Sequence, residues 1–224
     1  MNGPLAFVGS GEYTDKMLSV DEFLLSKIHR IPHVALFATA AAPEPDFKKW
    51  EEMGVSHFAK LNVEAVPIAL YGGSDARDES LVNSLSHFNF FYFSGGNPGY
   101  LLDILNGSPV WAKILELHKQ GAVLAGCSAG AMVMGETVWA RCFDYYNDKK
   151  MVPWEAGLGL AAFGVIPHYD AQPRYHNEKE IAEIEANYPA GHRLIGIDED
   201  TAYIKVGSEW TVMGSGSLHE IQNA

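Results

Sequence analysis

The chain has 224 residues, of which 47% are hydrophobic, and its formal net charge is −12. A chain of this length can bury a sizeable core, and we expect residues 1–224 to form a single domain. The acidic balance argues against a nucleic-acid or anionic-membrane surface. The two cysteines are too few for a disulfide framework, and no cysteine–histidine spacing matches a zinc site.

The first residues, "MNGPLAFVGSGEY", lack the basic start and the long apolar run of a signal peptide. No segment approaches the length of a membrane span. The Gly-x-Gly in this stretch lacks the third glycine and the distal acid of a dinucleotide-binding fingerprint. We therefore expect a cytoplasmic protein that needs no cofactor or metal ion and that binds neither nucleic acid nor membrane.

Short apolar runs alternate with amphipathic ones along the chain. The first half predicts strands and helices in alternation, at 5–10 (strand), 20–30 (helix), 33–40 (strand), 44–61 (helix), 64–70 (strand), 78–88 (helix), 90–96 (strand), 109–121 (helix) and 122–128 (strand). Beyond residue 130 the pattern predicts strands at 162–168 and 193–198, a helix at 178–188, and a strand pair at 201–206 and 210–214.

Strands that are apolar on both faces and separated by long helices indicate a parallel sheet covered on both sides. The last two runs flank a Gly-Ser-Glu turn and predict an antiparallel hairpin at the sheet edge. We therefore predict an α/β fold, a three-layer sandwich with a mostly parallel central sheet, helices on both faces and an antiparallel edge hairpin.

The stretch "GCSAG", residues 126–130, lies where the strand at 122–128 turns into a small-residue helix. It fits the pattern Gly-x-Ser-x-Gly, in which a nucleophile projects from a strained strand-to-helix bend. Ser128 occupies the central position, and the Ala129 amide would point at a developing oxyanion. Cys127 is expected to pack in the core, as unpaired cysteines usually do. The alternative is a tight bend that needs small residues for packing alone.

A nucleophilic serine needs a base within hydrogen-bond reach. His168 follows an apolar strand and Pro167, which places it at the carboxyl edge where ligands bind in open parallel sheets. His192 and His219 are the other candidates.

The sequence offers several carboxylates as candidates for the acid that would orient the histidine. Glu199 ends another predicted strand at the same edge, and the remaining candidates are Asp144, Asp170 and Asp198. A second oxyanion donor is predicted in "FSGGNPG", which offers the backbone amides of its two glycines, Gly95 and Gly96, and the side-chain amide of Asn97 one strand away. That segment could equally be only a turn into a helix.

With these residues in place, the chain resembles the S51 serine peptidases, the family of dipeptidase E and cyanophycinase. Six segments carry the resemblance in order: "FVGSGEYT", "ATAAAPEP", "FSGGNPGYLL", "GCSAGAM", "PHYD" and "GIDEDTA". The resemblance implies a fold like that of class I glutamine amidotransferases and a possible homodimer.

For the site, the resemblance implies Ser128 as nucleophile, His168 as base, and Gly96 or Asn97 with Ala129 as oxyanion donors. Dipeptidase E points to Asp144 as the acid and the cyanophycinase branch points to Glu199. We favour Glu199 because it ends a strand. Asn97-Pro98 departs from the pattern of both named branches, so neither substrate transfers directly.

The implied activity is serine exopeptidase or dipeptidase hydrolysis of short peptides after an N-terminal aspartyl or β-aspartyl residue, through an acyl-enzyme. Such a substrate requires a cation, for which Arg141 and Arg174 are the candidates. Two alternatives stay open. One is an α/β-hydrolase-type esterase, which would use Asp144 or Glu155 with a late histidine; the other is a catalytically silent binding domain of amidotransferase type.

Overall fold

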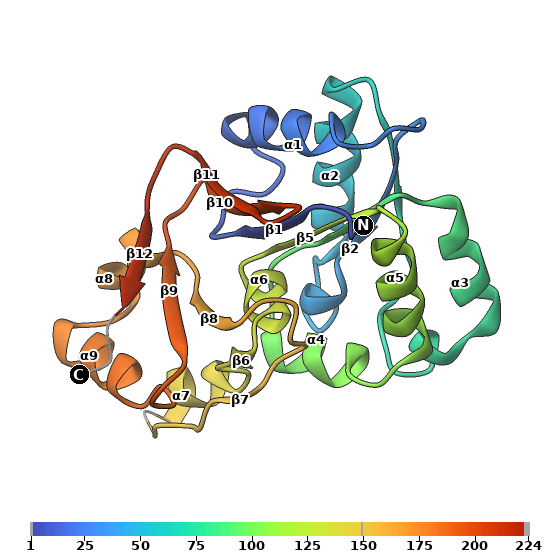
Figure 1. The fold of residues 1–224 in the computed structure, drawn as a ribbon. Helices are drawn as coiled ribbons and strands as arrows, with labels where there is room; N and C mark the ends of the chain where they lie inside the picture. The colour runs from blue at the N-terminus through green and yellow to red at the C-terminus, as the bar shows by residue number, and fades with distance from the viewer. Residues whose placement is uncertain (1, 149, 222–224) are drawn as a thin grey trace.

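The computed structural model describes residues 2–148 and 150–221 (Figure 1). Its strands are β1 (Leu5–Val8), β2 (His33–Phe37), β3 (Glu64–Pro67), β4 (Phe90–Phe93), β5 (Val123–Cys127), β6 (Thr137–Val138), β7 (Glu155–Ala156), β8 (Phe163–Ile166), β9 (Arg193–Ile197), β10 (Thr201–Val206), β11 (Glu209–Gly214) and β12 (Leu218–Ile221). Its α-helices are α1 (Leu18–Leu25), α2 (Lys48–Lys60), α3 (Glu79–Ser84), α4 (Pro98–Leu105), α5 (Pro109–Lys119), α6 (Ala129–Met134), α7 (Cys142–Asp148), α8 (Gln172–Tyr175) and α9 (Glu178–Ala186).

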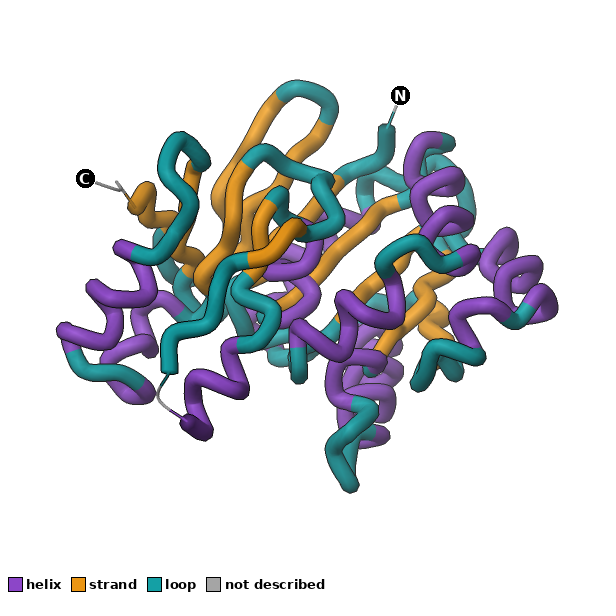
Figure 2. Tube along the Cα trace, turned by 90° about the horizontal axis from the view of Figure 1, so that it is seen from below, coloured by secondary structure: helices purple, strands orange, loops and turns teal. Residues whose placement is uncertain are grey.

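The main sheet has seven strands in the order β11-β10-β1-β5-β4-β2-β3. The five strands from β1 to β3 in this order run parallel, whereas β10 pairs antiparallel with both β1 and β11. Helices cover both faces, and Figure 2 shows the strands lying between groups of helices. The predicted α/β class, with a mostly parallel sheet and an antiparallel edge hairpin, is confirmed.

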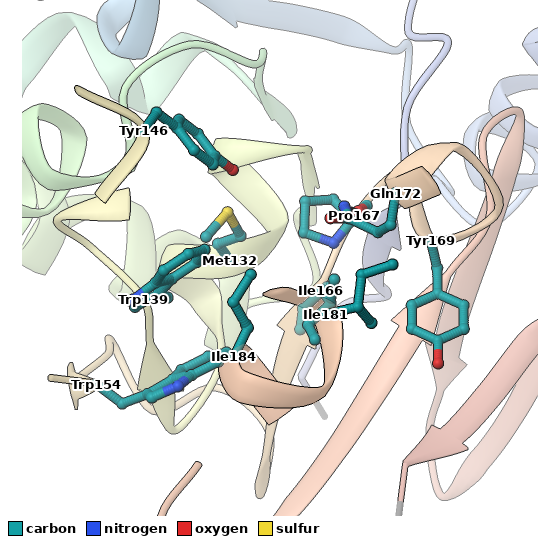
Figure 3. A pocket seen from close by; sticks show the side chains of 11 residues that line it. Met132, Trp139, Tyr146, Trp154, Ile166, Pro167, Tyr169, Gln172, Ile181 and Ile184 are labelled. Carbon is teal, nitrogen blue, oxygen red and sulfur yellow. Dashed lines mark hydrogen bonds between the residues drawn. The ribbon is translucent and has the colours of Figure 1, made fainter. Parts of the chain in front are cut away.

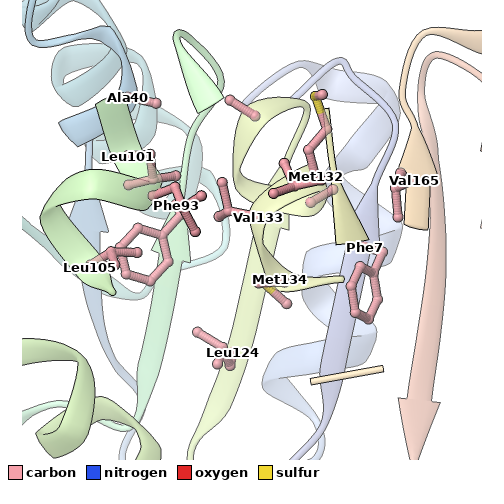
Figure 4. Packing of buried hydrophobic residues seen from close by; sticks show 14 of the residues in the cluster. Phe7, Ala40, Phe93, Leu101, Leu105, Leu124, Met132, Val133, Met134 and Val165 are labelled. Atoms are coloured by element: carbon pink, nitrogen blue, oxygen red, sulfur yellow. The ribbon is translucent and has the colours of Figure 1, made fainter. Parts of the chain in front are cut away.

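Alternation along the strands divides the core into two layers. In β4, Phe91 and Phe93 pack with α4, α5 and α6, while Phe90 and Tyr92 pack with α1 and α2 on the opposite face. This is the period-two pattern of a strand buried on both sides. Figure 4 shows the first layer, in which Phe93 lies against Leu101 of α4.

A second, three-stranded sheet stands beside the first, in the order β12-β9-β8. The strands predicted at 162–168 and 193–198 therefore pair with each other, in parallel, and not with the central sheet. Strand β12 closes this small sheet through antiparallel pairing with β9. Two separate sheets thus bring their strand ends to one place, which is where the candidate site lies.

Across the described part of the chain, every helix is too short or too polar to cross a membrane.

Candidate active site

Ser128 sits at the bend between β5 and α6 with a strained backbone, φ 50° and ψ −110°. Its two flanking glycines are required by close packing. A Cβ on Gly126 would lie 2.5 Å from the Gly130 backbone, and one on Gly130 would lie 2.6 Å from the Phe93 carbonyl oxygen. The bend is therefore both tight and strained, and strain of this kind clusters at functional sites.

Ser128, His168 and Glu199 form a continuous hydrogen-bonded chain. The Ser128 Oγ lies 3.0 Å from His168 Nε2, and His168 Nδ1 lies 2.9 Å from Glu199 Oε1. A carboxylate only accepts, so Nδ1 carries the proton and Nε2 accepts from the serine hydroxyl. The His168 and Glu199 side chains are 29% and 25% exposed, which leaves the chain within reach of a ligand.

Glu199 is fixed from three directions, because each of its polar groups has a partner. Its second carboxylate oxygen lies 3.3 Å from Arg174 Nη1, and its backbone amide donates to Asp170 Oδ1 at 2.8 Å. These contacts aim the remaining oxygen at the imidazole. Asp170, one of the candidate acids, thus accepts a hydrogen bond from the Glu199 backbone, and Glu199 is the carboxylate that contacts His168.

The turn that carries Glu199 is clamped against the loop after β1. The amide of Asp200 donates to the Ser10 carbonyl at 3.1 Å, and a Cβ on Gly11 would lie 2.2 Å from Asp200 Oδ1. A Cβ on Gly9 would lie 2.2 Å from the Asp198 carbonyl oxygen. The glycines after β1 therefore serve close backbone contact, which positions the acid relative to the serine.

The other predicted bases and acids have partners elsewhere. His219 Nε2 lies 2.8 Å from Asp198 Oδ1, and His192 Nδ1 lies 3.1 Å from Glu136 Oε2. Asp144 is exposed on α7, and the His168 nitrogen that an orienting acid would contact is bonded to Glu199. The structure therefore brings Glu199, and not Asp144, to His168.

Cys127 faces away from the cavity and into the core. Its thiol donates to Glu12 Oε2 at 2.9 Å, and burial together with this carboxylate raises the pKa of the thiol well above its ordinary value. The other oxygen of Glu12 accepts from the Gly95 amide at 2.8 Å. Glu12, in the loop after β1, thus contacts both the end of β5 just before Ser128 and the loop that follows β4. The sequence signal that could have identified Glu12 is its place directly after Gly11, in the glycine-containing loop that follows β1.

Of the three oxyanion donors that the resemblance implies, the amides of Gly96 and Ala129 have no acceptor among the described residues, whereas the Asn97 amide has one. The Asn97 amide donates to the Ala40 carbonyl at 2.8 Å, and its side chain caps α4, so the prediction of an Asn97 amide donor was wrong for the backbone group. The Gly96 amide has no acceptor among residues 2–148 and 150–221. The Ala129 amide, at the first position of α6, has no acceptor within its helix.

A cavity of about 400 Å³ opens beside these groups, within the size range of small-ligand sites. Ser128, His168 and Gly96 line one part of it, and residues of α6 and α7 line another. A smaller, apolar pocket of about 40 Å³ adjoins it and is shown in Figure 3, where Met132, shared by the two, points inward.

The two arginines predicted to bind substrate lie in different settings. Arg141 makes a two-pronged contact with Asp103, at 3.0 and 2.8 Å, and its Nε lies 3.4 Å from Glu155 Oε1. Its charge is therefore already balanced, and it does not line the cavity, so the prediction that Arg141 binds substrate is not supported. Arg174 lies beside Glu199 and is largely exposed.

The described residues contain no group of three or more histidine, cysteine, aspartate or glutamate side chains placed to hold a metal ion. What the arrangement offers chemically is a hydroxyl bonded to a histidine, a carboxylate behind that histidine, and, after β4 and β5, two amides that have no acceptor within the described part of the chain. These are the parts needed for acyl transfer.

Comparisons with known proteins point the same way. The sequence model of peptidase family S51 matches residues 5–213. A cyanophycinase of Trichormus variabilis is 31% identical over 168 residues, and one of Synechococcus elongatus is 29% identical over 167 residues. Each match covers 72% of this chain, but 54% and 50% of those relatives, so the chain spans about half the length of these cyanophycinases.

The crystal structure of a peptidase from an acI-B1 Actinobacterium is 30% identical and superposes with a TM-score of 0.87. It matches 100% of this chain and 92% of that one. The family match runs from the start of β1 into β11 and includes each of the elements that build the candidate site. The chain belongs to peptidase family S51.

Proposed function

We propose that the protein is a serine peptidase that hydrolyses short peptides, with Ser128 as nucleophile, His168 as general base and Glu199 as the orienting acid. The observation that carries the proposal is the unbroken chain from Ser128 Oγ to His168 to Glu199, at 3.0 and 2.9 Å, on the wall of the cavity. Membership of a peptidase family supports the same reaction class.

In the proposed reaction, the Ser128 oxygen attacks the peptide carbonyl carbon as its proton passes to His168 Nε2. Negative charge develops on the carbonyl oxygen, and the Gly96 and Ala129 amides supply the donors for it. Glu199 stabilises the imidazolium. Collapse breaks the C–N bond, the amine leaves with the proton from Nε2, and water then releases the acyl group by the same steps.

The preference for an aspartyl or β-aspartyl residue needs a cation beside the substrate. Of the two arginines singled out in the sequence, only Arg174 lies near the proposed triad, and it already contacts Glu199. This preference, the exopeptidase mode, the single domain, the homodimer and the cytoplasmic location stay predictions. Both cysteines are free and buried, which is compatible with a reducing compartment.

The test is labelling with a fluorophosphonate followed by mass mapping, together with hydrolysis of a dipeptide panel. We expect a single label on Ser128, with loss of label and of hydrolysis in Ser128→Ala. Ser56, an exposed serine on α2, provides the control variant Ser56→Ala, which should keep both. A folded protein that takes the label on Cys127, or takes none and cleaves no peptide, would overturn the proposal.

A further inference from the structure

Glu12 is a buried carboxylate to which the proposed reaction gives no part. It lies in the loop that follows β1 and is only 5% exposed. Taking a carboxylate out of water is costly unless hydrogen-bond donors replace its hydration. Two donors do so, because the Gly95 amide lies 2.8 Å from Oε1 and the Cys127 thiol lies 2.9 Å from Oε2. Neither donor is a cation, so what these contacts fix is position.

The two partners of Glu12 come directly before two groups on which the proposed reaction depends. Cys127 ends β5 and precedes Ser128, the proposed nucleophile. Gly95 lies after β4 and precedes Gly96, whose amide is a proposed oxyanion donor. One carboxylate therefore joins the strand end that carries the nucleophile to the loop that carries the donor, with one oxygen for each.

Gly95 packs closely against both Glu12 and the nucleophile. A Cβ on Gly95 would lie 3.2 Å from Glu12 Oε1 and 3.2 Å from Ser128 Cβ, which is closer than most Cβ contacts in folded proteins. The backbone itself thus fills the space beside Ser128. The hydrogen bond to Glu12 sets how closely the loop after β4 approaches the serine.

The far side of the same loop is fixed by the connection that follows β2. The Asn97 amide donates to the Ala40 carbonyl at 2.8 Å, and a Cβ on Gly96 would lie 2.4 Å from the Ala40 carbonyl carbon. The amides of Gly95 and Asn97 are thus both bonded, whereas that of Gly96 has no acceptor among the described residues. Glu12 on one side and Ala40 on the other hold Gly96 at the cavity wall.

The loop that carries Glu12 also supports the proposed triad. The amides of Ser128 and His168 donate to the carbonyls of residues 8 and 9, at 2.9 and 3.3 Å. The turn that carries Glu199 is bonded to the next carbonyl along the chain, at 3.1 Å. The segment that follows β1 is therefore a common support for nucleophile, base and acid, and the side chain of Glu12 extends this support to the oxyanion donor.

We infer that Glu12 is a positioning residue, whose two carboxylate oxygens hold the Gly95–Gly96 segment at a fixed spacing from Ser128 and so keep the oxyanion donor in place. The inference rests on the proposed peptidase function and adds a residue to it without changing the choice of substrate. Because the oxyanion forms only as the reaction proceeds, a misplaced donor should lower kcat and leave KM nearly unchanged.

Two substitutions separate the reach of this side chain from its charge. Glu12→Asp keeps the charge but is one methylene shorter, so it cannot contact Gly95 and Cys127 together. With the dipeptide that the parent cleaves best, we expect kcat to fall by about ten- to a hundredfold, the effect of a misplacement of about 1 Å, and KM to stay within about threefold. Glu12→Gln keeps the length and one acceptor for the Gly95 amide, so kcat should stay within about threefold.

Glu51→Asp is the matched control, since it also shortens a buried carboxylate. Glu51 on α2 is 9% exposed, accepts a hydrogen bond from the Tyr71 hydroxyl at 2.6 Å, and does not line the cavity beside Ser128. The control should keep kcat within about twofold. Urea unfolding of both aspartate variants shows whether a lower kcat merely follows a loss of stability.

A pH profile distinguishes a misplaced oxyanion donor from a disturbed base. The midpoint of kcat/KM reports the base of the free enzyme, so in Glu12→Asp it should stay within about 0.3 pH units of the parent while the plateau falls. A parent-like kcat or a shifted midpoint in Glu12→Asp would overturn the inference, and so would a Glu12→Gln variant that loses as much kcat.

These outcomes leave the proposed function standing as long as the parent cleaves peptides and takes the fluorophosphonate on Ser128. A parent protein that does neither would overturn the proposed function, and the inference about Glu12 would fall with it.

Discussion

Two histidine–carboxylate pairs of nearly equal length lie in different regions of this molecule. His57 Nε2 lies 2.8 Å from Asp21 Oδ2 between α1 and α2, and His168 Nδ1 lies 2.9 Å from Glu199 Oε1 at the meeting point of the two sheets. The first pair is 0% and 1% exposed, the second 29% and 25%. Only His168 contacts a serine.

The difference teaches that the surroundings, and not the contact itself, separate a structural pair from a candidate catalytic one. Around Asp21, burial raises the pKa of the carboxyl group, and the hydrogen bond from His57 acts against that rise. Such a pair ties two helices together, and both of its side chains are closed to solvent. The pair at His168 has a hydroxyl on one side and a cavity beside it.

The largest expected effect comes from breaking the exposed pair. Glu199→Gln keeps the shape of the side chain but removes the charge that fixes the histidine tautomer, so kcat should fall by about 10³- to 10⁴-fold. The matched control is Asp144→Asn, on α7, which should change kcat by less than about threefold. The measurement is steady-state hydrolysis of the preferred dipeptide by both variants.

A reversed result, in which Asp144→Asn loses activity and Glu199→Gln keeps it, would mean that the segment around α7 rearranges to supply the acid. Labelling of Ser128 by fluorophosphonate should follow the same order as kcat, because the reagent also depends on removal of the serine proton.

Breaking the buried pair should act on stability instead. Asp21→Ala leaves the His57 side chain buried without its partner, and we expect the free energy of unfolding to fall by about 3–5 kcal/mol. Glu199→Ala, at a partly exposed pair, should cost less than about 1 kcal/mol. Urea unfolding of the two variants measures both. Equal losses would remove the distinction between the pairs.

The fold was predictable because its elements are local. The alternation of apolar strands with amphipathic helices was enough to predict the fold class and the edge hairpin. The "GCSAG" pattern was enough to predict that Ser128 lies at a strand-to-helix bend. The pairing of β8 with β9 in a separate sheet was not predictable, since both strands read as apolar runs and their partners are decided by long-range packing. The position of His168 after β8 was still correct, because it follows from the strand end alone.

The site was predictable in its residue types and less so in its partners. Arg141 looked like a substrate cation because nothing nearby in the chain reveals Asp103, 38 positions away, which it contacts. The Asn97 backbone amide looked free because its acceptor, Ala40, belongs to a different βα connection. Contacts made across the sheet edge leave no periodic signal along the chain.

The adjacent residues Cys127 and Ser128 differ in the same way as the two pairs, because Cys127 is buried and Ser128 lines the cavity. Because the pKa of the Cys127 thiol is raised and the thiol donates to Glu12, we expect iodoacetamide at pH 8 to leave it unmodified in the native protein and to modify it after unfolding. Cys127→Ser preserves a donor for Glu12, so kcat should stay within about tenfold. Mass mapping and kinetics check the two statements, and rapid alkylation of the native protein would contradict the first.

The smallest effect concerns His118, a buried histidine that contacts a backbone carbonyl and not a carboxylate. His118 Nδ1 donates to the Ala122 carbonyl at 2.9 Å, and burial lowers the pKa of its imidazole from the ordinary value of 6.5. The folded state therefore binds a proton less readily than the unfolded state does. His118 favours folding above pH 6.5, and this contribution is lost as the pH falls towards and through the lowered pKa.

His118→Asn replaces the ring N–H by an amide N–H that can reach the same carbonyl but does not titrate. At pH 7.5 we expect its free energy of unfolding to lie within about 1 kcal/mol of the parent protein. Between pH 7 and pH 5 the parent should lose more stability than the variant. Every other titrating group is common to both proteins, so the difference between their urea-unfolding curves across this range isolates His118. Parallel curves would mean that a buried histidine bonded only to a carbonyl is protonated as easily as one in water, and the contrast with the carboxylate-bonded pairs would then lose its electrostatic basis.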